Sequence, residues 1–265
     1  MIGILGLEIH LYGLMVGFGL LAGGWVAAKI AKREGLDPDV VWDGLLWAMM
    51  AGIVGARLYH VADLWSYYSR HLAEIVMVWN GGLGIFGGVI GGIVGLILYV
   101  KLNQKSNIKY QKSLLKLFDL GALGIPLSQA IGRWGNFFNQ ELYGRPTSLP
   151  WGMFINPENR LPGFEQFSRF QPLFLYESLL NLGLFGLLLM AYSLWQKRSD
   201  WKAGSMKYVG MYLAGYGVIR FVLEPLRIDY WRVGVIPTAW IFSVVVMLWG
   251  AWLLMRGAKS AKRKT

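Results

Sequence analysis

The feature that most constrains this chain is a series of long apolar runs, several of them without any charged residue. A helix that crosses the hydrocarbon core of a bilayer needs about 20 mostly apolar residues. Four runs free of Asp, Glu, Lys and Arg approach or exceed that length, at Leu11–Ala28, Ile75–Val100, Ser178–Gln196 and Val233–Met255. Backbone polar groups must be satisfied within the chain in lipid, so runs this long predict membrane-spanning helices.

Three further runs are long enough but are interrupted by charge. They are Gly44–Ala62 with Arg57, Leu117–Gly135 with Asp119 and Arg133, and Tyr208–Glu224 with Arg220. Only 15% of the residues are charged, against about 25% in soluble domains, so we count these runs as spans too. We expect an all-α, polytopic integral membrane protein, a single membrane domain over 1–265 with an external loop at 136–171. The seven spans are predicted at about 11–30, 43–63, 79–100, 116–135, 174–195, 207–224 and 234–255.

The connections between these runs differ in positive charge. The segments at 29–41, 101–116, 196–207 and 256–265 hold 17 Lys and Arg, whereas the N-terminus and the segments at 65–74, 136–171 and 225–232 hold 6. Because Lys and Arg are retained on the cytoplasmic side, we predict the N-terminus outside and the C-terminus in the cytoplasm. Topology thereby accounts for most of the net charge of +11, and nucleic acid is not an expected partner.

Several kinds of site are disfavoured by what the chain contains. It has no Cys, which excludes disulfides, thiolate metal sites and a thiol nucleophile of its own. Its three His lie at positions without metal-ligand spacing, so neither a metal nor a cofactor is expected. The glycines at every fourth residue in GGLGIFGGVIGGIVG, residues 81–95, predict close helix packing rather than a nucleotide site.

The predicted orientation places three intramembrane arginines in the outer half of the bilayer. Arg57, Arg133 and Arg220 each lie late in an outward-going span. An Arg at mid-bilayer costs about 2.5–3.5 kcal/mol on insertion scales, and intramembrane ionisable residues are candidates for function. A single Arg of this kind can simply snorkel to the interface. Three at one depth favour a shared polar site near the outer leaflet.

Polar residues gather beside two of these arginines. The stretch GRWGNFFNQELYGRPT, residues 132–147, packs amide and carboxyl side chains around Arg133, and Arg220 shares a helix face with Glu224. Guanidinium forks bind phosphate in a bidentate manner, so we predict an anionic phospholipid headgroup as ligand. Tyr12 can add a hydroxyl, although taken alone it is better explained as an ordinary interfacial aromatic. The expected substrate-binding residues are Arg57, Arg133, Asn136, Asn139, Gly144 and Arg220, and the expected catalytic residues are Tyr12, Arg133, Glu141, Arg220 and Glu224.

At these residues the chain resembles the bacterial prolipoprotein diacylglyceryl transferases. GRWGNFFNQELYGRPT is similar to the long signature of that family. Other stretches agree in order: HLYGLM at 10–15, GARLYHV at 55–61, GGLGIFGG at 81–88, PLFLYES at 172–178 and GYGVIRFVLEPLR at 215–227. The resemblance implies transfer of a diacylglyceryl group from phosphatidylglycerol to the lipobox Cys thiol of prolipoprotein signal peptides. It also implies a multi-pass location in the bacterial cytoplasmic (inner) membrane.

Two departures from the family pattern bear on the mechanism. Phe86 and Gln171 stand where many relatives have His, so a mechanism with a His base at either position cannot operate here. We expect electrostatic catalysis by the arginines instead, with Glu141 or Glu224 assisting proton removal. Two alternatives remain: a non-catalytic homologue that binds phospholipid or lipoprotein precursors, and an anion transporter, for which the inner-half Asp119 and Ser128 are weak support.

Overall fold

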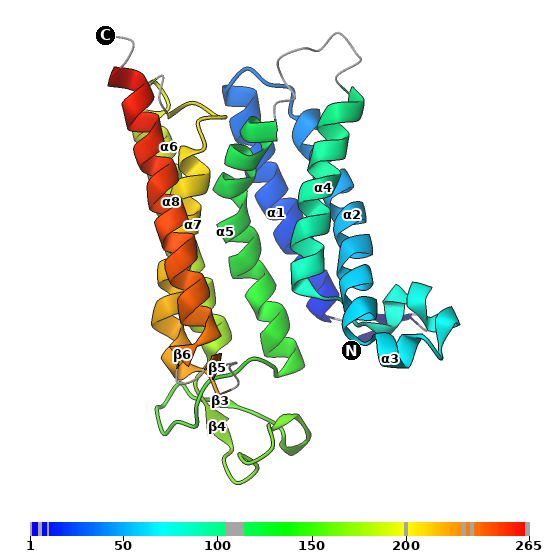
Figure 1. Cartoon of the computed structure of the whole chain (residues 1–265). Coiled ribbons are helices and arrows are strands. Elements are labelled where there is room, and N and C mark those ends of the chain that lie inside the picture. Colours follow the sequence, from blue (N-terminus) through cyan, green and yellow to red (C-terminus); the bar gives the residue numbers. More distant parts are fainter. Residues whose placement is uncertain are drawn as a thin grey trace. The chain divides into compact units, whose positions relative to one another are not determined.

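The computed structural model describes residues 2–4, 7–9, 11–103, 114–198, 201–228, 232–233 and 236–262. These residues include seven helices long and apolar enough to cross a membrane (Figure 1). The helices are α1 (Leu11–Arg33), α2 (Asp39–Asp63), α4 (Ile85–Asn103), α5 (Leu114–Asn139), α6 (Leu173–Trp195), α7 (Lys207–Leu223) and α8 (Thr238–Lys262). The prediction of an all-α, polytopic membrane protein with seven spans is confirmed.

The remaining elements are short. They are α3 (Trp65–Tyr68), the 3-10 turns η1 (Leu72–Val76), η2 (Val78–Asn80), η3 (Pro157–Asn159) and η5 (Glu224–Leu226), and the strands β1 (Ile2–Ile4), β2 (Leu7–Ile9), β3 (Met153–Phe154), β4 (Arg169–Phe170), β5 (Arg232–Val233) and β6 (Ile236–Pro237). The strands form three antiparallel pairs, β1 with β2, β3 with β4 and β5 with β6.

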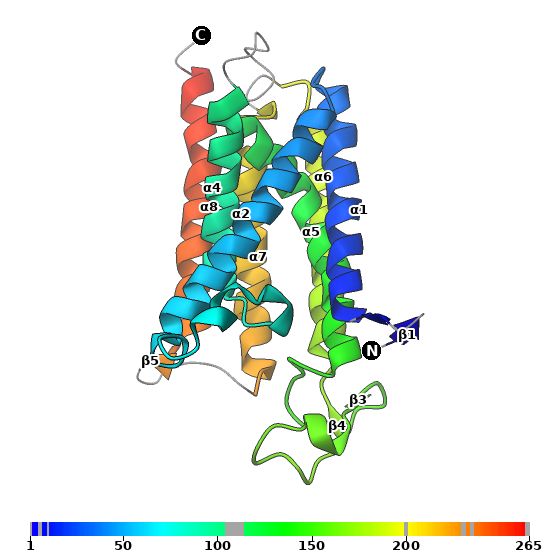
Figure 2. The same cartoon turned by 90° about the vertical axis from the view of Figure 1, so that its right-hand side faces the viewer.

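The chain divides into two compact units, each described here by itself. One unit comprises residues 28–117 and the other comprises residues 1–27 together with 118–265. In the first unit, α2 and α4 lie side by side in both views (Figures 1 and 2). A side chain added at Gly95 would come within 2.9 Å of the Ala51 Cβ, and one added at Gly91 would come within 3.1 Å of the Gly55 Cα. The glycine spacing therefore serves the predicted close packing, and α2 is the partner helix.

The helix α4 begins at Ile85, later than the predicted start near 79. The residues before it form η1 and η2, and the chain then turns through Gly81 and Gly82, with φ of 82° and 68°. Positive φ is readily available only to glycine, so these two residues end the turns and redirect the chain into the helix. An apolar run alone does not reveal such a break.

In the second unit, polar contacts join α5 to its neighbours. The Ser178 hydroxyl donates to the carbonyl oxygen of Ala130 at 2.9 Å, and Gln129 Nε2 donates to the Tyr212 hydroxyl at 2.9 Å. The fully buried Asp119 carboxylate accepts from the backbone N–H groups of Met206 at 2.7 Å and Val209 at 3.1 Å. It thereby satisfies N–H groups at the start of α7 that have no partner within the helix.

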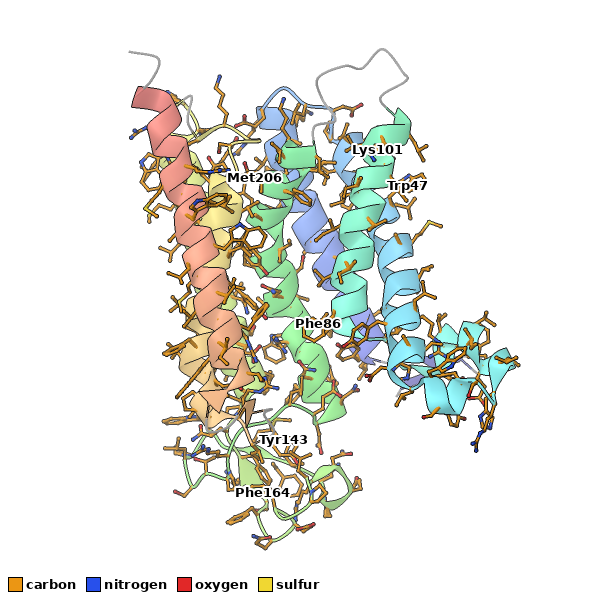
Figure 3. The ribbon with its side chains drawn as sticks, in the orientation of Figure 1. Trp47, Phe86, Lys101, Tyr143, Phe164 and Met206 are labelled. Atoms are coloured by element: carbon orange, nitrogen blue, oxygen red, sulfur yellow. The ribbon has the colours of Figure 1, made fainter. Side chains whose placement is uncertain are left out.

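The segment between α5 and α6, which the sequence predicts to be external and which we call the external segment, has a small core of its own. Tyr143, Met153, Ile155 and Phe170 are buried together, and Phe164 packs against them (Figure 3). The Tyr143 hydroxyl donates to the Asn159 carbonyl at 2.9 Å and accepts from the Leu161 N–H at 2.7 Å. Burial raises the pKa of this phenol above its ordinary value. The predicted external loop is thus a folded element, and α5 continues into it as far as Asn139.

Candidate active site

Five charged side chains meet where α5, α6, α7 and η5 come together. Glu177 forms ion pairs with three arginines: Arg133 at 2.5 Å, Arg220 at 3.4 Å and Arg227 at 3.7 Å. Glu224 lies 3.3 Å from Arg220 and 3.9 Å from Arg227. We call these five residues the Arg–Glu cluster. Its three guanidinium groups and two carboxylates leave one net positive charge.

Local structure explains why the members of the cluster converge. Arg220 and Glu224 are one helical turn apart on α7, so their side chains share a face. Pro225 ends the helix, and η5 turns the chain so that Arg227 comes back within reach of Glu224. Glu177 lies in the second turn of α6, where it is almost fully buried. A buried carboxylate requires a cation partner, and α5 and α7 supply two.

Burial separates the two kinds of charge in the cluster. The side chains of Glu177 and Glu224 are 3–4% exposed, whereas those of the three arginines are 16–22% exposed. The carboxylates therefore lie beneath the guanidinium groups, and an approaching anion meets positive charge first. Burial, and next the charge of Arg220, lowers the pKa of Arg227 below its usual value. Binding an anion would relieve this unfavourable environment.

A chain of amide hydrogen bonds extends the cluster to Glu141. Arg133 Nη1 donates to Asn136 Oδ1 at 3.3 Å, and Asn136 Nδ2 donates to Glu141 Oε1 at 2.8 Å. Asn139 Nδ2 reaches the same carboxylate oxygen at 3.5 Å. The residues on both sides of Glu141, Gln140 and Leu142, have φ of 53°. Left-handed backbone at two non-glycine residues is strained and is often found at functional sites.

Gly144 allows the external segment to cross close to the cluster. Its backbone N–H donates to the Gln171 carbonyl at 2.8 Å, and the next N–H, from Arg145, donates to the Leu226 carbonyl at 2.8 Å. A Cβ at Gly144 would lie 2.7 Å from the Gln171 Cβ and 2.8 Å from the Leu226 carbonyl oxygen. Any side chain here would therefore displace the backbone next to Arg227.

Tyr12 reaches the same end of α5. It lies in the first turn of α1, is 40% exposed, and its ring is so close to Gly135 that a Cβ there would approach Tyr12 Cδ2 to 2.8 Å. Gly135 stands between Arg133 and Asn136 in sequence and accommodates the ring. The structure thus places the predicted residue Tyr12 against α5 at Gly135, the residue before Asn136.

Arg57 belongs to the other compact unit, and its donors are occupied by backbone. Its Nε donates to the Ile75 carbonyl at 2.9 Å, its Nη1 donates to the Gly81 and Gly82 carbonyls at 2.8 and 3.2 Å, and its Nη2 donates to the Glu74 carbonyl. The guanidinium also lies 5.2 Å from the centroid of the Tyr68 ring. Arg57 therefore anchors the segment of η1 and η2. Its predicted role in substrate binding stays a prediction.

Two members of the cluster were missed by sequence reasoning. Glu177 lies just before an uncharged run, and Arg227 falls in a connection between predicted spans. One signal was present: Glu224 can pair with Arg220 on the same helix, which leaves Arg133 without a partner, and Glu177 lies inside the predicted span at 174–195. The unmatched arginine implied another carboxylate in a neighbouring helix.

Gln171 and Phe86, which stand where the family resemblance led us to expect His, are not bases. Gln171 Oε1 accepts from the Tyr176 hydroxyl at 2.8 Å, and that hydroxyl accepts from Trp151 Nε1 at 2.8 Å. Gln171 therefore ties the external segment to the start of α6. Phe86 lies in the first turn of α4, in the other compact unit, and is 57% exposed (Figure 3). Within the described ranges, no group of three or more His, Asp and Glu residues is arranged to hold a metal ion.

The chain is similar to known proteins over most of its length. Residues 1–256 match the profile of a family described as prolipoprotein diacylglyceryl transferase. A relative from Fervidobacterium nodosum is 38% identical over 97% of this chain and 84% of its own length. Relatives from Thermosynechococcus vestitus and Thermotoga maritima are 36% and 38% identical, over 94% and 97% of this chain and 89% and 85% of theirs. Each is named phosphatidylglycerol–prolipoprotein diacylglyceryl transferase.

Proposed function

The chain belongs to the prolipoprotein diacylglyceryl transferase family and is a membrane-bound transferase, and we propose that it uses the Arg–Glu cluster to bind phosphatidylglycerol. The diacylglyceryl group is transferred to the lipobox Cys thiol of a prolipoprotein, the first step of bacterial lipoprotein maturation. The observation that carries this proposal is a net-positive arginine cluster laid over two buried carboxylates.

The reaction exchanges one carbon–oxygen bond for one carbon–sulfur bond. The thiol sulfur attacks the glycerol carbon that carries the phosphate, the thioether forms, and the phosphate oxygen leaves with the bonding electron pair. Glycerol phosphate is released, and the thiol proton passes to a base. The nucleophile comes from the substrate, which is consistent with a chain that has no Cys.

The arginines supply the electrostatic part of catalysis. Arg133, Arg220 and Arg227 present partly exposed guanidinium groups from three elements, and such forks bind phosphate oxygens in pairs. Negative charge grows on the leaving phosphate during carbon–oxygen cleavage, so donors already aimed at it stabilise the transition state. Glu177 and Glu224 hold the guanidinium groups in place and act as positioning residues.

Glu141 is the carboxylate best placed to accept the thiol proton. Glu177 and Glu224 each contact two or more arginines in a buried setting, where protonation would leave those cations without a partner. Glu141 is exposed and, among the residues described, accepts from the Asn136 and Asn139 amides. Those amides orient the carboxylate, and the Tyr12 hydroxyl at the same helix end orients the headgroup.

The site works near the outer leaflet of the bacterial inner membrane. This placement rests on the excess of Lys and Arg in alternate connections, which sets the N-terminus outside and the C-terminus in the cytoplasm. The ends of α5 and α7 that carry Arg133 and Arg220 then face outward. Nucleic acid has no role in this assignment, and the whole chain acts as one membrane domain.

A transporter is less well supported than a transferase. The inner-half Asp119 binds backbone N–H groups at the start of α7, and the Ser128 hydroxyl donates to the Gly124 carbonyl within α5. Both side chains serve helix packing, so neither marks a polar path to the cytoplasm.

The test is transfer by the purified protein. The protein in detergent is given phosphatidylglycerol and a lipobox peptide, and the peptide is analysed by mass spectrometry for a diacylglyceryl adduct on Cys. We expect an adduct with the wild type, a loss of at least 100-fold for Arg133→Ala and Arg220→Ala, and wild-type transfer for the exposed control Arg70→Ala.

Two outcomes would overturn the proposal. If the Thermotoga maritima relative forms the adduct and this chain does not, the chain is a non-catalytic homologue that binds phospholipid or precursors. If Arg133→Ala and Arg220→Ala retain wild-type transfer, the chain is a transferase but the Arg–Glu cluster is not its phosphate site.

A further inference from the structure

The outer end of α7 contains a backbone carbonyl that the helix itself cannot satisfy. In an α-helix the Phe221 carbonyl would accept from the N–H four residues later, but that residue is Pro225, which has no N–H. The N–H before it, from Glu224, donates to the Arg220 carbonyl instead. The Phe221 carbonyl therefore belongs to the unsatisfied groups of a helix end, and such a group is destabilising when water does not reach it.

A tryptophan of the next helix supplies the missing donor. Trp240 lies in the first turn of α8, and its Nε1–H donates to the Phe221 carbonyl oxygen at 3.1 Å. Its ring also stacks on the Phe221 ring, with 5.3 Å between the centroids and 26° between the planes. One side chain of α8 thus contacts both the backbone and the side chain of the same residue of α7.

This contact continues a close interface between two helices. α7 and α8 lie side by side (Figure 1), and a Cβ at Gly217 would come within 2.9 Å of the Ser243 carbonyl oxygen. Phe221 lies one turn after Gly217, and Trp240 lies three residues before Ser243. In this antiparallel pair the tryptophan is therefore the next contact toward the Arg–Glu cluster.

Three of the five members of the Arg–Glu cluster depend on this turn of α7. Arg220 directly precedes Phe221, Glu224 lies three residues after it, and Arg227 follows η5. The Arg227 N–H donates to the Glu224 carbonyl at 3.1 Å, so these two residues are held in one turn. Any unwinding of this turn would move all three side chains relative to Glu177 on α6.

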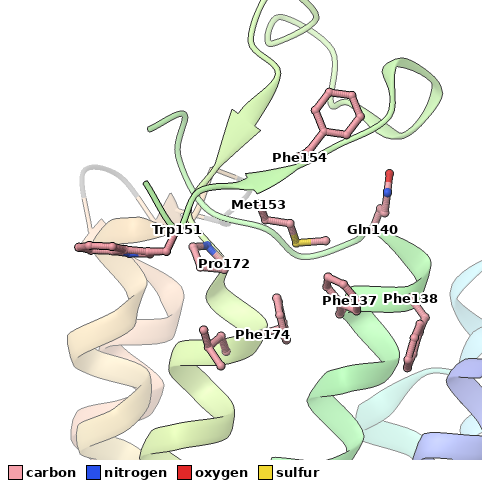
Figure 4. Close-up of a pocket in the computed structure, with 9 residues that line it drawn as sticks. Phe137, Phe138, Gln140, Trp151, Met153, Phe154, Pro172 and Phe174 are labelled. Carbon is pink, nitrogen blue, oxygen red and sulfur yellow. The ribbon is translucent and has the colours of Figure 1, made fainter. Parts of the chain in front are cut away.

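The same turn is held a second time, by the external segment. The Arg145 N–H donates to the Leu226 carbonyl at 2.8 Å. The segment is in turn seated on the ends of α5 and α6, where the Met153 side chain faces the Phe137 and Phe174 rings (Figure 4). The arginines of α5 and those of α7 are therefore fixed through separate contacts, and α8 supports only the second set.

An ordinary interfacial tryptophan does not account for these contacts. Such a residue turns the polar edge of its ring toward water and headgroups. Trp249 of the same helix is 54% exposed and has no hydrogen-bond partner among the residues that the structure describes. Trp240 is half-buried and directs its N–H into the backbone of α7.

We propose that Trp240 is a positioning residue for diacylglyceryl transfer. Its indole N–H replaces the hydrogen bond that Pro225 removes, and it thereby fixes the turn that carries Arg220, Glu224 and Arg227. This rests on the proposed transferase function. Stabilisation of a leaving phosphate requires donors that are already aimed at it, so a loosened turn lowers kcat more than it raises KM.

Two substitutions separate the two contacts of Trp240. Trp240→Phe keeps a ring against Phe221 and removes the donor, whereas Trp240→Gln keeps an N–H donor and removes the ring. In the peptide assay, Trp240→Phe should lower kcat about 10-fold, with KM for phosphatidylglycerol within twofold of wild type. Trp240→Gln should retain at least half of the wild-type kcat.

The matched control is Trp249→Phe, the same substitution at an exposed position of the same helix, and it should leave kcat and KM unchanged. Thermal unfolding in detergent is followed on every variant, and kcat is expressed per folded molecule. If Trp240→Phe keeps more than half of the wild-type kcat, or if Trp240→Gln is as slow as Trp240→Phe, the indole N–H does not position the cluster. If wild-type protein modifies no peptide, the transferase function itself fails, and the two failures are thereby distinguished.

Discussion

The sharpest consequence of the Arg–Glu cluster concerns Glu177, which none of our sequence arguments selected. Glu177→Gln keeps the size of the side chain but removes the negative charge that three arginines share, at 2.5, 3.4 and 3.7 Å. The net charge of the cluster rises by one unit, and only Glu224 remains to hold Arg220 and Arg227. Arg133 loses the one ion pair that the structure gives it.

The magnitude follows from burial. The Glu177 side chain is 4% exposed, and removing one partner of a buried ion pair costs about 3–5 kcal/mol. The arginines are 16–22% exposed and can turn toward water, so we take the lower limit, about 3 kcal/mol. If restoring the guanidinium geometry raises the activation free energy by this amount, kcat/KM falls by about 100-fold. The extra positive charge favours phosphate binding, so the loss should be in kcat, with little change in KM for phosphatidylglycerol.

Kinetics of peptide diacylglycerylation measure this directly, with thermal unfolding in detergent followed on the same samples. The matched control is Glu165→Gln, a carboxylate of the external segment that accepts from the Gly163 N–H and contacts no arginine side chain in the described structure. It should leave kcat and KM unchanged. A Glu177→Gln protein that keeps more than half of the wild-type kcat/KM would refute the idea that this carboxylate positions the arginines.

Three other predictions concern Gly144, Asp119 and Phe86. Gly144→Ala should lower transfer at least 10-fold, because its Cβ would lie 2.8 Å from the Leu226 carbonyl oxygen and move the backbone beside Arg227; unchanged kinetics would exclude that role. Asp119→Ala should destabilise the protein by about 3 kcal/mol, since it leaves backbone N–H groups of α7 unpaired; differential scanning fluorimetry should show a lower Tm, with transfer per folded molecule unchanged. Phe86→His should leave the rate within about twofold of wild type in the peptide assay, because we propose Glu141 as the proton acceptor; a large increase would mean that a His base is needed at this position.

The sequence predicted well those features that depend on neighbours along the chain. Long apolar runs require helices in lipid, and the seven helices follow from four uncharged runs and three that are interrupted by charge. The spacing of Arg220 and Glu224 places both on one face, and the structure pairs them at 3.3 Å. The stretch from Arg133 to Glu141 likewise forms one connected chain through Asn136.

Contacts between segments that are distant in sequence were harder to predict. Arg57 and Arg133 look alike in sequence, since both are single arginines late in apolar runs. Arg57 donates to four backbone carbonyls, two of which belong to the turn at Gly81 and Gly82. Arg133 instead forms an ion pair with a carboxylate on α6. The depth of a residue in the membrane predicts the need for a partner but does not say whether that partner is backbone, carboxylate or substrate.

Charge balance resolves part of that ambiguity. Arg57 has no ion pair in the part of the chain that the structure describes, and it donates to neutral backbone carbonyls, which suits a residue that anchors η1 and η2. The cluster instead contains three cations and two carboxylates, with the cations nearer the surface. A site that was purely structural would be most stable with equal charge and complete pairing. The remaining positive charge, exposed above two buried carboxylates, is unfavourable until an anion binds, and that is the arrangement a phosphate-releasing transferase requires.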